Sequence, residues 1–124
     1  MTAQEIFDKV SLHLLTQNEK SIAKDEFGRQ KMCLYRGANG LKCAIGCLIP
    51  DDKYDREAME GLAASSFNGD TPSCLPNLLP QDMPRANGKN FLLDMQDIHD
   101  RYQPDDWKYK LVEFAERYEL SCNL

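Results

Sequence analysis

The chain has 124 residues, of which 42% are hydrophobic and 28% charged, a composition typical of one soluble globular domain and not of a disordered chain. Its 15 basic and 20 acidic side chains give a net charge of −5, which argues against general binding to the phosphate backbone of nucleic acids. No apolar run approaches the ~18 residues of a membrane span, and the acidic N-terminal segment is unlike a secretory signal, so we expect a cytoplasmic protein.

The first segment predicts a helix over about residues 2–17. Thr2 and Glu5 have the spacing of a capping box, in which each side chain bonds the backbone N–H of the other residue. Ile6, Val10 and Leu14 then recur at helical spacing on one side. Residues 18–31 are polar without a clear period, and we predict a loop there.

Residues 32–50 are the most distinctive part of the chain. Residues 32–36 resemble a strand, residues 37–40 (Gly-Ala-Asn-Gly) favour a tight turn, and residues 41–44 return as a second short strand. This pattern predicts a small β-hairpin. Residues 44–49 are apolar on every side and must be buried, either as a strand or as a short helix.

The second half predicts three more helices. Asp55 suits the N-cap of a helix over residues 56–64, while the prolines and glycines of residues 65–90 favour single turns such as residues 75–79. Helices follow over residues 88–101 and from Pro104, where Asp105 and Asp106 complement the helix dipole. The fold class expected is α+β, mainly α: a single compact domain over residues 1–124 with about four helices and a small β-hairpin. Nine apolar residues of these elements are predicted to be buried together: Phe7, Val10, Leu14, Ile45, Leu48, Ile98, Trp107, Leu111 and Phe114.

The five cysteines are odd in number, which favours reduced thiols over a disulfide framework. We expect Cys43 and Cys47 to be small buried hydrophobes. A metal or nucleotide sensor built from Cys33, Cys43, Cys47 and a histidine is a weaker alternative, because no pair has diagnostic ligand spacing. No metal and no cofactor are therefore expected.

A second candidate chemistry joins Cys43 with His99. If residues 44–49 are helical, Cys43 lies at a helix N-terminus, where the dipole favours the thiolate, and His99 could act as its base with Asp94 or Asp100 as the orienting carboxylate. The catalytic candidates are thus Cys43, His99 and Asp100. The alternative is that the cysteine is inert packing, and the chain has none of the common phosphate-loop, serine-hydrolase or zinc-protease motifs.

Acidic residues gather in the C-terminal part. Residues 51–124 hold 15 acids and eight bases, net −7, whereas residues 1–50 hold five acids and seven bases, net +2. The acids of interest lie at every third position of one predicted helix and at the start of the next: Asp94, Asp97, Asp100, Asp105 and Asp106. They are either a solvated face, a surface for a basic partner protein, or, as a third choice, a divalent-ion site without EF-hand spacing.

The motif from Cys33 to Asp51, with Tyr54 and Glu60-Gly61, resembles a group of small uncharacterised proteins from bacteria and their phages. The C-terminal pattern around His99 and Trp107 is similar to that group as well. The resemblance implies no mechanism. A wider set shares the Cys-Ala-x-Gly element but has Asn-Asp at the position of His99-Asp100, which argues against Cys-His catalysis. It implies a structural core in which Ala44 and Gly46 allow close packing.

These observations predict a small acidic cytoplasmic binding protein of bacterial or phage type. It would occlude a partner protein that has a basic surface, as inhibitors, anti-defence proteins and immunity proteins do, and it would not be a catalyst. The five acids named above are the predicted partner-binding residues. The alternative is a Cys-dependent enzyme that uses Cys43 and His99.

Overall fold

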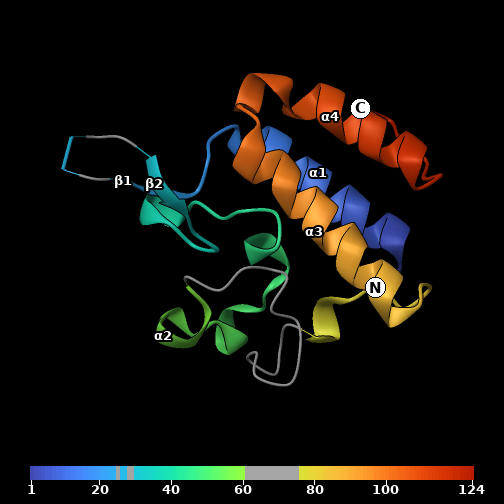
Figure 1. Cartoon of the computed structure of the whole chain (residues 1–124), viewed down its shortest axis with the longest axis horizontal. Coiled ribbons are helices and arrows are strands. Elements are labelled where there is room, and N and C mark those ends of the chain that lie inside the picture. Colours follow the sequence, from blue (N-terminus) through green and yellow to red (C-terminus); the bar gives the residue numbers. More distant parts are fainter. Residues whose placement is uncertain (25, 28–29, 61–75) are drawn as a thin grey trace.

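Three long helices lie side by side and form the body of the computed structural model (Figure 1). They are α1 (Ala3–Gln17), α3 (Arg85–Arg101) and α4 (Pro104–Arg117), and α4 packs against both of the others. The structure describes residues 1–24, 26–27, 30–60 and 76–124. Within these ranges no helix is both long and apolar enough to span a bilayer. The described chain is a mainly helical, compact domain.

The predicted capping box begins α1. Glu5 N–H donates to Thr2 Oγ1 at 3.2 Å, and Thr2 N–H donates to Glu5 Oε1 at 2.8 Å. The helix ends at Asn18, whose left-handed backbone (φ 51°) lets its N–H bond the Leu14 carbonyl. Both ends of α1 are therefore fixed by local hydrogen bonds, and this part of the prediction is confirmed.

One hydrophobic core joins the helices to the segment of residues 34–49. All nine residues predicted to be buried together belong to it. The Phe114 ring stacks on Phe7 at a centroid distance of 5.9 Å and meets the edge of Phe91 at 5.0 Å. Because Phe7, Phe91 and Phe114 come from α1, α3 and α4, these contacts fix the three helices to one another.

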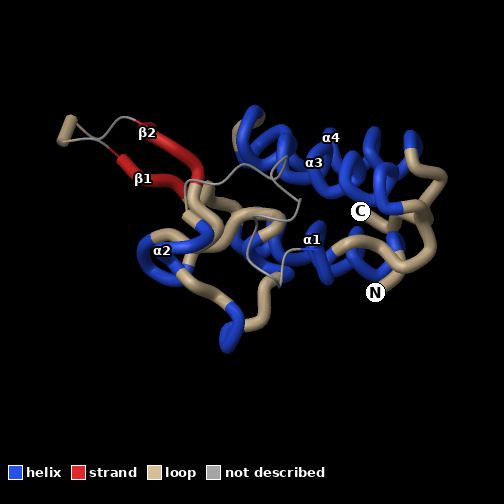
Figure 2. Tube along the Cα trace, turned by 60° about the horizontal axis from the view of Figure 1, so that its bottom comes forward, coloured by secondary structure: helices blue, strands red, loops and turns tan. Residues whose placement is uncertain are grey.

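The strands differ from the prediction. β1 (Ile22–Lys24) pairs antiparallel with β2 (Gln30–Cys33), with Ile22 opposite Cys33. The prediction of a loop over residues 18–31 is thus wrong at β1 and at the first two residues of β2. The reason is that this ladder extends away from the helices (Figures 1 and 2), so its residues need no alternating apolar face to form strands.

The prediction of a β-hairpin from residues 32–36 and 41–44 is wrong. Arg36 and Lys42 form an isolated β-bridge across the 3-10 turn Ala38–Gly40, and Cys43 N–H donates to the Tyr35 carbonyl at 3.2 Å, but these two described segments form no strand ladder. The turn does use positive φ, at Asn39 (58°) and Gly40 (76°). The chain then leaves the bridge for a turn and the 3-10 helix Gly46–Leu48, because that path buries most of residues 43–49 in the core. Cys43 is buried as predicted, whereas Cys47 is only partly buried.

The fourth helix is short in the described part of the chain. α2 (Arg56–Met59) is a single turn that begins at the predicted residue, and the rest of its predicted length lies outside the described residues. The 3-10 turn Pro76–Leu78 confirms the single turn predicted for residues 75–79. α3 begins three residues before its predicted start, directly after Pro84.

Candidate functional site

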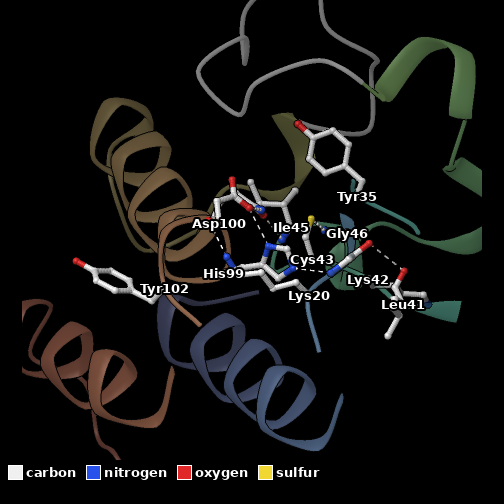
Figure 3. Close-up of polar contacts among 12 residues, drawn as sticks. Lys20, Tyr35, Leu41, Lys42, Cys43, Ile45, Gly46, His99, Asp100 and Tyr102 are labelled. Atoms are coloured by element: carbon white, nitrogen blue, oxygen red, sulfur yellow. Dashed lines mark hydrogen bonds and ion pairs between the residues drawn. The ribbon is translucent and has the colours of Figure 1, made fainter. Parts of the chain in front are cut away.

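His99 lies fully buried in the last turn of α3 and makes two hydrogen bonds (Figure 3). Ser21 N–H donates to its Nε2 at 2.9 Å, and its Nδ1 lies 2.8 Å from Asp100 Oδ1. A backbone N–H only donates, so Nε2 is the acceptor and Nδ1 carries the proton that Asp100 accepts. His99 therefore points into the protein, and its tautomer is set by these two partners.

Asp100 extends this network to the distinctive segment. Its Oδ1 also accepts from Gln96 Nε2 at 2.7 Å, and Gln96 Oε1 accepts from Ile45 N–H at 2.9 Å. On the other side, Lys20 Nζ donates to the Asp100 carbonyl at 3.0 Å. The network therefore ties the end of α3 to the start of β1 and to residues 44–49. Gln96 was not among the predicted site residues, and nothing in its spacing distinguishes it.

The Cys43 thiol lies in the same region but is not activated by it. Cys43 is 1% exposed, and its Sγ accepts from Gly46 N–H at 3.2 Å, as a capping side chain does. Burial is the main influence on the Cys43 thiol and raises its pKa, which is the reverse of what a nucleophile needs. The structure thus gathers Cys43, His99 and Asp100 in one region, while the ring nitrogens of His99 serve Ser21 and Asp100. In this arrangement the polar side chains join neighbouring segments, and burial of Cys43 disfavours its thiolate form.

A second polar cluster is centred on Glu60, at the end of α2. Its carboxylate accepts from Tyr35 N–H at 2.8 Å, Arg36 N–H at 3.2 Å and Tyr54 OH at 2.5 Å. Arg36 Nη2 in turn lies 2.8 Å from Asp51 Oδ1. Burial, followed by the hydrogen bond to Glu60, raises the pKa of Tyr54 to about 12. Sequence reasoning missed this cluster, although Tyr54 and Glu60 stand in the motif that carries the resemblance.

The predicted acidic row along α3 does not form one equivalent set. Asp94 accepts from Tyr118 OH at 2.5 Å and Asp97 lies 3.5 Å from Arg101 Nε, whereas Asp100 is held in the His99 network. Successive residues of an α-helix are rotated by 100° about its axis, so residues spaced by three do not point in the same direction. Asp94 and Asp100 therefore point about 120° apart. The helix geometry therefore distributes these acids over different surroundings.

The outer side of α4 carries a group of acidic side chains around an exposed tyrosine, with Lys110 at its edge, 3.3 Å from Glu113. We call it the α4 acidic face: Asp105, Asp106, Tyr109, Glu113 and Glu116. It lies opposite the buried stripe of this helix, which includes Trp107 and Leu111. Tyr109 is 65% exposed, and a hydrogen bond to Glu113 raises its pKa. Tyr109 was not predicted as a site residue, although its helical spacing from Asp105 and Glu113 indicates that it lies on the same side of α4 as these acids.

Comparison with known proteins gives no relative of this chain: no family model, no curated protein and no solved structure matches it. The resemblance to small bacterial and phage proteins stays a prediction that is based on the motif. Within the described ranges, no three His, Cys, Asp or Glu side chains converge closely enough to hold a metal ion.

Proposed function

We propose that this protein is a binding protein whose α4 acidic face docks on a basic surface of a partner protein and occludes it. The observation that carries the proposal is Tyr109, a large aromatic side chain left 65% exposed among acidic residues. Tyrosine is enriched among the residues that contribute most to protein interfaces, because its ring buries much area and its hydroxyl still forms hydrogen bonds. The surrounding carboxylates would raise the rate of encounter with a basic partner.

The charges elsewhere on the molecule support the choice of this face. Of the predicted acids on α3, Asp94 lies 3.5 Å from Arg117 Nη1 and Asp97 lies 3.5 Å from Arg101 Nε, so their fields are partly neutralised. On the α4 acidic face Glu113 is partly neutralised in the same way, since Lys110 Nζ lies 3.3 Å from its carboxylate, and the field of this face comes mainly from Asp105, Asp106 and Glu116. Asp105 and Asp106 are exposed at the start of α4. The five acids predicted from the sequence are thus replaced in this proposal by the α4 acidic face, which keeps two of them. An inhibitor or immunity-like protein of a bacterium or phage would act in this manner.

Crosslinking tests the position of the interface. A photoreactive phenylalanine at Tyr109 should capture a protein from a bacterial lysate, and the same group at Leu12, which is 70% exposed on α1, should not. Capture at both positions alike, or at neither, would contradict the proposal.

Association kinetics with the captured partner test the role of charge. Asp105→Asn with Glu116→Gln removes two exposed charges from the α4 acidic face, and Asp8→Asn with Glu57→Gln removes two exposed charges from other elements. We expect the first pair to slow association about tenfold at low salt, with little change at high salt, because exposed charges act mainly on the encounter rate. The proposal fails if the control pair slows association equally.

A further inference from the structure

A groove of about 780 Å³ lies where the end of α1, β1, the turn of residues 37–41, α2 and the start of α4 meet. Its apolar lining includes Ile22, Leu34, Leu41 and Pro104. Pockets for small molecules in proteins commonly have volumes of about 300–1,000 Å³ and combine apolar walls with a few polar groups. The groove therefore has the size of a small-molecule site, and it shares no residue with the α4 acidic face.

One buried residue, Ser21, holds the walls of this groove in place. Its carbonyl accepts from Leu34 N–H at 2.8 Å, and its Oγ donates to the Leu41 carbonyl at 3.3 Å. Its own N–H is bonded to His99, as described above. The backbone of Gly37 also passes so close that a Cβ there would lie 2.8 Å from Ser21 Oγ. These contacts fix the walls before any ligand arrives, which lowers the entropic cost of binding.

The charged groups of the groove favour an anion. Among the described lining residues, Lys20 and Arg56 are the cations and Glu19 is the acid, so the lining is net positive on a chain of net charge −5. Lys20 Nζ uses one of its three protons on the Asp100 carbonyl (Figure 3), which leaves two for a ligand. The exposed Arg56 guanidinium offers a planar set of donors that suits carboxylate, sulfonate and phosphate oxygens.

We infer that this groove is a binding site for a small amphipathic anion. The apolar body of the ligand lies on Ile22, Leu34 and Leu41, and its single anionic group lies between Lys20 and Arg56. The two cations come from the α1–β1 connection and from α2, so the anion bridges two segments that are far apart in the sequence.

Two dyes test this assignment on the full chain. 8-Anilino-1-naphthalenesulfonate has an aromatic body and one anionic group, and N-phenyl-1-naphthylamine has the same rings without the sulfonate. We expect one saturable site for the sulfonate, with an affinity that Arg56→Gln lowers about three- to tenfold, since an exposed ionic contact is modest in strength. The uncharged dye should bind Arg56→Gln and the parent equally. Arg85→Gln removes an exposed cation outside the groove and should change neither affinity.

A second variant tests the location without removing charge. Ala38 is exposed and lines the groove, so the indole of Ala38→Trp would occupy it and should abolish binding of both dyes, with an unchanged melting temperature showing that the fold is intact. The inference is overturned if the parent has no saturable site for the sulfonate or if Arg85→Gln weakens it as much as Arg56→Gln. Full binding by Ala38→Trp would overturn it as well.

Discussion

The backbone of Gly46 passes so close to Tyr35 that an added Cβ would lie 1.9 Å from the Tyr35 carbonyl oxygen and 2.7 Å from its carbon. Cys43 N–H donates to the same carbonyl at 3.2 Å, which holds the two segments together. The resemblance implied close packing at Ala44 and Gly46. The structure gives the physical reason at Gly46, because only a hydrogen fits between these two stretches of backbone.

Gly46→Ala should therefore lower the free energy of unfolding by about 3 kcal/mol or more, since the clash is with backbone that cannot rotate away. Gly40→Ala is the matched control. Gly40 has no atom within 4 Å of an added Cβ, but its φ is +76°, so this change should cost only about 1 kcal/mol of backbone strain. Urea denaturation of the two variants measures the difference, and equal losses would show that the contact at Gly46 is not tight.

For single residues, the sequence predicted which side chains lie together better than it predicted what each of them does. Cys43, His99 and Asp100 do gather in one region, as the catalytic hypothesis required. Their roles depend on which atom faces which, and the partner of His99 Nε2 is the backbone N–H of Ser21. Every residue except proline has such a group, so no sequence pattern could have marked Ser21.

Among elements, α3 shows how one repeated residue type takes different roles. Asp97 faces Arg101 near the surface, whereas Asp100 accepts hydrogen bonds from His99 and Gln96, although its side chain is still 38% exposed. The difference arises because residues spaced by three point in different directions around the helix axis.

We predict that Asp100→Asn lowers the free energy of unfolding by about 1–2 kcal/mol, because an amide oxygen accepts both hydrogen bonds more weakly than a carboxylate. Asp97→Asn makes the same chemical change three residues away and should stay within about 0.5 kcal/mol of the parent, as exposed positions usually do. Thermal or urea denaturation at neutral pH compares the two. If Asp97→Asn lowers the free energy of unfolding as much as Asp100→Asn does, the His99 network adds no more stability than an exposed aspartate does.

The elements that were predicted correctly are those whose buried face follows a strong period. The capping box and apolar stripe of α1, and Pro104 at the start of α4, are local signals that the fold obeys. β1 was missed because its ladder lies away from the helices, so no alternation of apolar residues was required. The segment of residues 41–49 was ambiguous because a run that is buried on all sides has no period.

For the whole molecule, Trp107 is the largest of the fully buried side chains. It packs in the core that joins the three long helices, and its Nε1 donates to the Tyr102 carbonyl at 3.1 Å. The prediction of a common core held for two reasons: seven of the nine residues repeat at helical spacing on α1, α3 and α4, where an apolar stripe has to be covered, and Ile45 and Leu48 belong to a run that is apolar on every side.

Trp107→Ala should cost ~3–5 kcal/mol, which is a large part of the ~5–15 kcal/mol that stabilises a domain of this size. We therefore expect the variant to be poorly soluble or partly unfolded. Circular dichroism in urea measures this loss of stability. Tyr109→Ala removes an exposed aromatic from the same helix and should change stability by less than about 0.5 kcal/mol. If Trp107→Ala melts within a degree or two of the parent, α4 does not depend on this face.

Trp107 is also the single tryptophan of the chain, and its ring stacks on His99 at a centroid distance of 5.5 Å. The tryptophan fluorescence of this protein therefore comes from one place, the junction between α4 and the imidazole that Ser21 and Asp100 hold. Entry of water at that junction shifts the emission to longer wavelength, while circular dichroism follows the helices. The molecule thus carries its own optical reporter, which separates an opening of the His99 region from the melting of the bundle.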